Sequence, residues 1–587
     1  MKPALRIEPS DLQRRLLRFL ERESATELRA HDEMRALPID ERVVSGECID
    51  SATVIEVSKE AVVLRVNDNP SRFREGDSVC LGDGTRFDEA LSLVYRSFDP
   101  ERAELVLARD AYAKFDDHDL RIGQACVVDR RPFTAGSLLA PVVAQAFEDP
   151  LLREILTGAR EHARDDARYA RALLQMRELG LDESQALGAA EAIAARDLAL
   201  IQGPPGTGKT RMLATMLCAL AQKGCRVVVS AFTHRAIDNV LLAVRQRDRT
   251  ASVVKLASSR DSGAAELRAM GVRVVNPRQL ELSRPGEIVG GTAFAVRRLG
   301  NRPAFHFAVF DEAGQMPIPH ALAGMLLARH FVFVGDHRQL PPVVTSPDRD
   351  EIAAVSIFEH LERSYGAHML ETSYRMNAGI CSVIGDTFYG GRLRPAAAAA
   401  SRRMPFVPGG AHDDVLDPDK PVVIARVDHL QPGSRSVEEA HLVADLIDEC
   451  IRRHGVPAAE IAVLAPFRAH VRALRTAIEK KGIDVTNLVI DTVDRVQGQE
   501  REIVFLSLAC GDASTLDQRS AFFFSPNRLN VALSRARTKA ILVCSSSVAT
   551  ALPMDPAALK AAAIYKTLWR RLPQVDLTAV YGPRRRD

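Results

Sequence analysis

Short runs of consecutive apolar residues recur along the middle of the chain, separated by segments whose apolar residues have helical spacing. Between residues 198 and 336 these runs are "LALIQG", "CRVVVSA", "SVVKLA", "EIVGGT", "FAVFDE" and "FVFVGD". A second series, "PVVIARV", "IAVLAPF", "LVIDTV", "EIVFLSL" and "KAILVCS", lies between 421 and 545. Such runs are typical of strands buried on both faces of a parallel sheet. The pattern predicts an α/β fold with two parallel-sheet domains in tandem and crossover helices between strands.

The first 180 residues follow different patterns. Residues 10–36 have the spacing of a helix, whereas residues 45–135 contain alternating and β-branched runs between turn signals. We therefore expect a small antiparallel β-barrel, flanked by helices, ahead of the two sheets. The expected domains are an N-terminal helical segment (1–44), the barrel (45–135), a helical stalk (136–180), two α/β domains (181–365 and 366–575) and a basic C-terminal tail (576–587).

Composition narrows the class of protein. Hydrophobic residues make up 46% of the chain and charged residues 26%, the balance of a soluble globular protein. The net charge is only +2, so nucleic acid could bind only where positive charge is concentrated in a groove. The nine cysteines are dispersed without metal-binding spacing, which predicts reduced thiols. Because the charged N-terminus resembles neither a signal peptide nor a membrane span, we expect a cytoplasmic protein with no membrane partner.

The segment "LIQGPPGTGKT" joins a predicted strand to a predicted helix, which is the setting of a phosphate-binding loop. Gly203, Gly206 and Gly208 would let backbone N–H groups point at phosphate oxygens. Lys209 would reach the β- and γ-phosphates of ATP, and Thr210 would hold Mg²⁺. The alternative is a glycine-rich turn that binds nothing, which this combination of motif and setting disfavours.

A pair of carboxylates ends the predicted strand "FAVFDE". In a chain with a phosphate-binding loop, Asp311 is expected to hold Mg²⁺ through water, and Glu312 to orient and deprotonate the attacking water. The alternative is an acidic pair that is merely solvated at a strand end. Together with the loop, the pair predicts a nucleoside triphosphatase.

Six motifs in order extend this prediction: "GPPGTGKT", "DEAGQ", "GDHRQLPP", "YRMN", "QGQE" and "NVALSRAR". Over about residues 181–548 the chain resembles the superfamily 1 helicases, in particular the type B branch that includes the nonsense-mediated-decay helicase. The resemblance implies that both α/β domains are RecA-like. It also implies movement from 5′ to 3′ along a single strand, and it makes the preceding barrel an accessory domain.

The resemblance assigns roles around the nucleotide. Gln185 corresponds to the glutamine that reads adenine, and its side-chain amide can both donate to and accept from a base edge. Tyr374 corresponds to the aromatic residue that stacks on the base, and Glu500 to a residue linked to the sugar. Gln339 corresponds to the sensor of the γ-phosphate. For Gln185, an ordinary place on a helix surface stays an alternative.

Two arginines complete the implied site. Arg375 and Arg535 correspond to arginine fingers, which stabilise the charge that develops on the transferred phosphoryl group. The loop and the carboxylates lie on the first α/β domain, and the arginines lie at or beyond the start of the second. ATP would therefore be fully contacted only when the domains close. Surface salt bridges are the alternative for either arginine.

Nucleic-acid contacts are implied on a face of both domains away from ATP. The corresponding segments are "SAFTHRAIDNV", "GGTAFAV" and "DTVDRVQG", and the candidate residues are Thr233, His234, Thr292 and Thr492. Hydroxyls and N–H groups at helix starts suit phosphate oxygens. Ordinary helix capping is an equally good interpretation for any single threonine. The family's usual Pro-Ser-Asn in the first segment is Phe232-Thr233-His234 here.

The leading prediction is an ATP-dependent helicase acting on single-stranded nucleic acid and its duplex junctions. A translocase that strips proteins from a strand without unwinding would use the same residues. An ATP-gated clamp without catalysis is the third alternative, although the catalytic residues are all present. The sequence does not distinguish DNA from RNA, nor does it indicate protein partners or oligomeric state.

Overall fold

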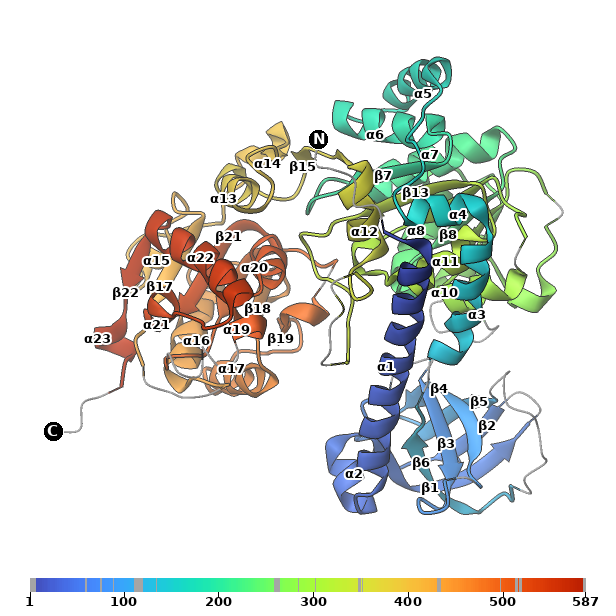
Figure 1. Ribbon diagram of the computed structural model, residues 1–587. Helices are drawn as coiled ribbons and strands as arrows, with labels where there is room; N and C mark the ends of the chain where they lie inside the picture. Colours follow the sequence, from blue (N-terminus) through green and yellow to red (C-terminus); the bar gives the residue numbers. More distant parts are fainter. Residues whose placement is uncertain are drawn as a thin grey trace.

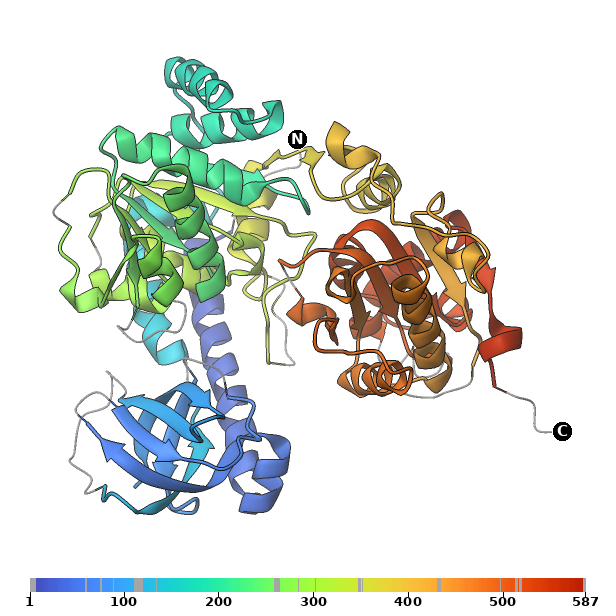
Figure 2. The same ribbon diagram turned by 180° about the vertical axis from the view of Figure 1, so that it is seen from behind.

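The computed structural model describes residues 7–583 apart from 59–60, 74–76, 88, 110–119, 133–134, 258–263, 283, 301, 347–349, 351, 430–433, 497, 513–515 and 517–519. Two parallel sheets lie in separate bodies, and a barrel lies at the far end of a long helix from the first of them (Figures 1 and 2). The α/β class and the preceding barrel are thus as the sequence predicted. No helix of the described part has both the length and the apolar composition needed to cross a membrane.

The barrel is closed, antiparallel and six-stranded, in the order β1-β2-β5-β4-β3-β6. Alternate residues point inward, so that Val54, Val62, Leu64, Leu105 and Leu107 are fully buried in its core. The strands are β1 (Cys48–Val57), β2 (Ala61–Arg65), β3 (Ser78–Gly82), β4 (Leu91–Asp99), β5 (Glu104–Arg109) and β6 (Ala125–Arg130).

Helix α1 (Pro9–Arg35) connects the barrel to the first α/β domain, with α3 (Ala135–Glu148) beside it (Figures 1 and 2). Leu12 and Leu16 of α1 share one buried cluster with Leu139 and Val143 of α3 and with side chains of the first sheet. The short helix α2 (Ile39–Ser45) packs on β1 of the barrel, and α4 (Pro150–Leu156) packs on α3. The stalk is therefore built from α1 and α3 together.

The rest of the segment expected to form the stalk lies elsewhere. Helix α5 (Asp166–Glu178) packs on α6 (Glu183–Ala194), and both cover the first α/β domain. The sequence pattern identified α5 as a helix. It could not show whether the apolar face of α5 packs on the stalk or on the first α/β domain.

The first sheet is parallel, in the order β10-β9-β11-β8-β12-β13-β7-β14. All six expected apolar runs are strands; β10 and β14 are additional. Its strands are β7 (Leu198–Gln202), β8 (Val227–Ser230), β9 (Val253–Leu256), β10 (Arg273–Val275), β11 (Ile288–Gly290), β12 (Phe307–Phe310), β13 (His330–Gly335) and β14 (His368–Met369). Its helices are α7 (Lys209–Gln222), α8 (His234–Arg247), α9 (Ala264–Ala269), α10 (Ala293–Val296), α11 (Ile318–Met325) and α12 (Ile357–Tyr365).

The second sheet is also parallel, in the order β19-β18-β20-β21-β17-β22, and all five expected runs are strands. Its strands are β17 (Val422–Arg426), β18 (Ile461–Ala465), β19 (Val489–Thr492), β20 (Arg501–Ser507), β21 (Ala536–Cys544) and β22 (Gln574–Asp576). A pair formed by β15 (Thr372–Ser373) and β16 (Arg394–Pro395) precedes it. The helices are α13 (Ala378–Phe388), α14 (Ala397–Ala400), α15 (Asp413–Leu416), α16 (Val437–Arg452), α17 (Arg468–Lys480), α19 (Ser520–Phe523), α20 (Pro526–Leu533), α21 (Ser547–Thr550), α22 (Pro556–Arg571) and α23 (Thr578–Tyr581).

All nine cysteines are free thiols, and all but the half-buried Cys225 are buried. This agrees with the prediction drawn from their dispersed spacing. Burial raises the pKa of several of these thiols, that of Cys218 to about 11, so they are held in the protonated, unreactive form.

Candidate ATPase cleft and nucleic-acid contacts

A cleft of about 810 Å³ lies between the two α/β domains. The carboxyl ends of β7, β8 and β12 form its wall on the first domain, and segments around residues 375, 500 and 535 form the opposite wall. Twelve of the predicted site residues line this cleft: Gly206, Gly208, Lys209, Thr210, Thr233, Asp311, Glu312, Gln339, Tyr374, Arg375, Glu500 and Arg535. The remaining five, Gly203, Gln185, His234, Thr292 and Thr492, are not among its lining residues.

The loop after β7 has the backbone that its glycines allow. Gly206 and Gly208 have φ angles of 73° and 74°, in the left-handed region that side chains disfavour. A Cβ on Gly206 would also lie 2.5 Å from the Cβ of Arg375. Lys209 begins α7, and its Nζ donates a 2.8 Å hydrogen bond to the carbonyl oxygen of Gly203. The lysine is thus folded over the loop, above the place where phosphates would lie.

The loop is braced from behind by the segment that contains Gln185. This side chain is fully buried, and its Nε2 donates to the carbonyl oxygen of Thr207 at 2.8 Å. Its Oε1 has no hydrogen-bond partner among the described residues. The alternative of a surface glutamine is therefore wrong, because packing of α6 on α7 encloses the side chain.

Asp182, which was not among the predicted site residues, is bonded to both residues expected beside the adenine base, Gln185 and Tyr374. Its carboxylate accepts from the backbone N–H of Gln185 at 3.0 Å and from the hydroxyl of Tyr374 at 2.6 Å. The backbone N–H of Tyr374 donates to the carbonyl oxygen of Gly206 at 2.7 Å. The sequence offered one signal for Asp182: it is an aspartate at the N-cap of a helix, three residues before Gln185.

The carboxylate pair lies at the end of β12. Asp311 is 4% exposed, and burial together with the charge of Glu312 raises the pKa of Asp311 to about 7, against the opposing effect of Lys209. Glu312 has a left-handed backbone, with φ of 50°, and Gln315 Nε2 donates to its carboxylate at 3.4 Å. The strained backbone turns the carboxylate of Glu312 into the cleft.

A buried polar network joins the first domain to the second behind Gln339. Nε2 of Gln339 donates to Asp336 at 2.8 Å, and Asp336 also accepts from the hydroxyl of Tyr389 at 2.6 Å. Asn530 of α20 donates to that hydroxyl oxygen and to the carbonyl oxygen of Arg338, each at 2.8 Å. The γ-phosphate sensor expected from the sequence is therefore bonded to groups that bridge the domains.

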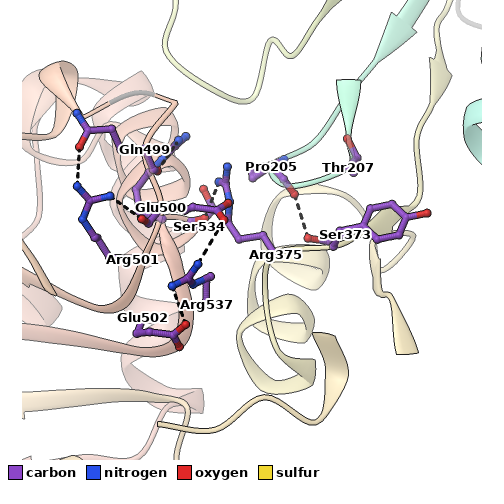
Figure 3. Close-up of polar contacts among 12 residues, drawn as sticks. Pro205, Thr207, Ser373, Arg375, Gln499, Glu500, Arg501, Glu502, Ser534 and Arg537 are labelled. Atoms are coloured by element: carbon purple, nitrogen blue, oxygen red, sulfur yellow. Dashed lines mark hydrogen bonds and ion pairs between the residues drawn. The ribbon is translucent and has the colours of Figure 1, made fainter. Parts of the chain in front are cut away.

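The backbone of Arg375 lies beside the loop, and its side chain reaches away from it to the second domain (Figure 3). Its Nε donates to Glu500 at 2.6 Å and its Nη1 to the carbonyl oxygen of Ser534 at 3.0 Å. Burial opposes the ionisation of Glu500, but Arg375 and then Arg537 outweigh it and hold the pKa of Glu500 below its ordinary value. The hydroxyl of Ser373 donates to the carbonyl oxygen of Pro205 at 3.1 Å, so this segment touches both walls.

Arg535 is 3% exposed and lines the same wall. Its Nε donates to the carbonyl oxygen of Val531 at 3.1 Å and its Nη1 to that of Gln499 at 3.2 Å. Burial, and then the neighbouring charge of Arg375, lower the pKa of Arg535 to about 9. Surface salt bridges, the alternative for this arginine, are excluded by its burial.

The four expected nucleic-acid contacts are dispersed. Thr233 caps α8, accepting from the N–H of Ala236 at 3.2 Å, and it lines the nucleotide cleft. The expectation that it lies on a face away from ATP is wrong, because the carboxyl ends of neighbouring parallel strands meet at one edge. His234 is exposed beside it. Thr292 and Thr492 are half-buried helix-start residues whose side chains make no capping hydrogen bond.

An aromatic group near Thr233 was not predicted. Phe232 is 37% exposed and meets His320 edge-on at 5.6 Å between ring centroids. His320 in turn meets Phe294 at 5.4 Å, and its burial lowers its pKa to about 4. Phe232 lines both the nucleotide cleft and a cavity of about 720 Å³ beside α1 and the barrel.

The chain matches known proteins over its α/β domains. Two families described as AAA domain match residues 180–380 and 353–547. The DNA replication ATP-dependent helicase/nuclease JHS1 of Arabidopsis thaliana is 28% identical over 400 residues, 64% of this chain and 29% of that protein. DNA replication ATP-dependent helicase/nuclease DNA2 of Homo sapiens is 25% identical over 603 residues, 92% of this chain and 55% of that protein. The chain thus spans about half or less of the length of these relatives.

Solved structures of viral helicases are also similar. A crystal structure of Arterivirus nonstructural protein 10 (helicase) matches with a TM-score of 0.37 and 14% identity, covering 87% of this chain and 80% of that one. Its complex with DNA matches with a TM-score of 0.33 and 17% identity, covering 65% and 67%. The two AAA-domain matches and the helicase relatives in sequence agree with the resemblance of the ordered motifs to the superfamily 1 helicases.

Proposed function

We propose that the protein is an ATP-dependent helicase that moves 5′ to 3′ along a single strand and unwinds duplexes. One observation carries this proposal: a single cleft brings Lys209, Asp311 and Glu312 of the first domain opposite Arg375 and Arg535 of the second. The type B branch is part of the proposal, and the motif order and the barrel before the first sheet support it.

ATP would bind with its phosphates on the loop. Lys209 would exchange its bond to the Gly203 carbonyl for phosphate oxygens, and Gln185 and Tyr374 lie on the side where adenine would stack. Glu312 would accept the proton of the attacking water. The guanidinium groups of Arg375 and Arg535 would stabilise the charge of the transferred group.

Mg²⁺ is implied by the family, and the residues present fit it. Thr210 and Asp311 both line the cleft, and the raised pKa of Asp311 marks a buried carboxylate that a cation would stabilise in its charged form. When bound, the ion would neutralise charge on the phosphate oxygens.

Relative motion of the domains would follow from this arrangement. Arg375 is bonded to Glu500 and Ser534 of the second domain, while the adjoining Ser373 and Tyr374 are bonded to the loop of the first. Phosphates on the loop would attract both arginines and draw the walls together, and hydrolysis would release them. Alternating closure is the motion that a strand-moving protein requires.

The direction of movement is testable with tailed duplexes. We expect ATP-dependent strand separation from a duplex with a 5′ single-stranded tail and little from one with a 3′ tail. The relatives are DNA replication proteins by name, so DNA is the first substrate to test, with RNA of matched length beside it. ATPase rates with and without single strands should be measured in parallel.

The other outcomes separate the alternatives. Unwinding only from the 3′ tail would contradict both the polarity and the type B placement. Strand-stimulated ATPase without strand separation would indicate a translocase that displaces proteins. Tight strand binding that responds to ATP, without hydrolysis, would indicate a clamp.

A further inference from the structure

A shallow groove of about 310 Å³ lies between α16 and α17 of the second α/β domain, away from the nucleotide cleft. The two helices lie side by side in Figure 1, and they are in direct contact. Exposed cationic side chains stand along the groove: Arg435, just before α16, and Arg472 and Lys480 of α17. Short alanine side chains line the space between them.

No carboxylate is among the described residues that line this groove. The acidic residues at the start of α16 are engaged elsewhere: Glu438 accepts from the hydroxyl of Ser436 at 3.1 Å, and the buried Glu439 bonds to His429 and Ser507. Glu438 and the exposed Glu479 lie next to the groove in sequence, but the charged residues that line the groove itself are all basic. Since the whole chain carries a net charge of only +2, this lining is a local concentration of positive charge.

The positions on α17 share one face of the helix. Ala469, Arg472, Ala473 and Lys480 recur at the three- and four-residue spacing of a single face. From Arg472 to Lys480 the helix rises about 12 Å, a length that covers about three to four nucleotides at the roughly 3.4 Å spacing of one strand of B-form DNA. Arg468 and Arg475 are exposed on the same helix and add to the positive charge nearby.

The groove begins at the sheet edge where the strand is proposed to lie. β18 and β19 are parallel, with Ala465 paired to Thr492 at their carboxyl ends. Helix α17 starts three residues after β18, and α16 starts after the loop that follows β17. The N-terminal ends of both helices, which favour anions, are therefore on the side of Thr492.

We propose that this groove binds the phosphate backbone of nucleic acid, extending the track of the strand from Thr492 outward over the second domain. The inference rests on the proposed helicase function. Arginine and lysine bind phosphates without reading bases, and the alanines leave room for the backbone to approach. A strand that reaches the groove gains contacts that a shorter strand, held only between the two domains, does not make.

The test compares single strands of two lengths. The double variant Arg472→Gln/Lys480→Gln changes only exposed side chains and keeps good helix-forming residues. Affinities should be measured by titration across a salt series, with mixed-sequence DNA of about 10 nucleotides and of about 30 nucleotides. For the long strand we expect affinity to fall about tenfold at low salt and the log–log salt slope to become shallower by about 1.4, two contacts of about 0.7 each. Affinity for the short strand should change little.

A matched control removes the same charge from another helix. Lys560→Gln/Arg570→Gln alters two exposed cations of α22, outside the groove, and should bind both strands like the wild type. Arg435→Gln, on the opposite side of the groove, should repeat the effect of the α17 variant at about half its size in salt slope.

The outcomes are distinct. A long strand bound equally well by the α17 variant and the wild type, with the same salt slope, would overturn the proposal and leave an acidic protein as the alternative occupant. Equal loss for short and long strands would also overturn it, because the residues would then belong to the motor track itself. If the wild type bound neither strand, the proposed helicase function would fail, and the groove with it.

Discussion

Replacing Glu312 by glutamine is expected to abolish ATP hydrolysis while leaving ATP binding intact. The amide keeps the size of the side chain and tolerates the same backbone, whose φ of 50° turns the side chain into the cleft. It cannot accept the proton of the attacking water. General-base catalysis contributes about 10²–10⁴-fold, so steady-state turnover should fall by at least that factor.

Lys209→Ala is the matched comparison. Removing this amine deletes the positive charge above the loop, and both nucleotide affinity and turnover should fall, the latter to background. Nucleotide affinity by titration and ATPase rate should be measured for both variants. Substantial turnover in Glu312→Gln would remove Glu312 from the role of base, and normal nucleotide affinity in Lys209→Ala would show that the loop does not use it.

Most strands of both sheets could be predicted, because strands of a parallel sheet are buried on both faces and therefore have unbroken runs of apolar residues. The strands that were missed are β10, β14 and β22, which have two or three residues each and lie at sheet edges. The residues of β14 ("HM") and β22 ("QVD") are too few to show a periodic pattern of apolar residues. These segments are strands because a neighbouring strand offers them hydrogen-bonding partners. The presence of that neighbour depends on the whole fold and cannot be predicted from the residues of the segment alone.

The same limit applies to the site. Lys209 and Asp311 could be predicted because the phosphate-binding loop and the carboxylate pair are each a pattern of a few consecutive residues. The network of Asp336, Tyr389 and Asn530 joins residues 53 and 141 positions apart, and no local pattern connects them. The position expected for Thr233 was wrong for a geometric reason: Phe232 and Thr233, which follow the end of β8 at Ser230, line the cleft because β8 and β12 end at the same edge of the sheet.

Glu500 shows how the structure changes an interpretation. The resemblance linked it to the sugar of the nucleotide, whereas here its carboxylate pairs with Arg375 at 2.6 Å and with Arg537 at 3.7 Å. An arginine held by a carboxylate of its own domain has a fixed direction before phosphates arrive. If Arg375 is an arginine finger, as proposed, this ion pair would compete with the phosphates for the same guanidinium group, and Glu500 would help to position the finger.

Arg375→Ala and Arg535→Ala should each lower the rate of hydrolysis in a single turnover by about 10³-fold or more, with a much smaller loss of ATP affinity. A finger acts on charge that appears only as the phosphoryl group transfers, so its removal raises the barrier more than it weakens the ground state. Arg535 meets the structural requirement, since it lines the cleft and the pKa of about 9 leaves it largely charged at neutral pH. Arg375 meets it because it lines the same cleft, directly beside Gly206 of the loop.

Arg537→Ala is the control for these two variants. Arg537 belongs to the same group of ion pairs, bonding Glu460 and Glu502 at 2.6 and 2.7 Å, but it does not line the cleft (Figure 3). Its loss should leave the single-turnover rate close to that of the wild type. If Arg537→Ala were as slow as Arg375→Ala, the effect would come from disrupting the ion pairs that hold the second domain together. If instead Arg375→Ala or Arg535→Ala kept a normal rate, that arginine would be structural, and closure of the cleft would have to be driven by the other.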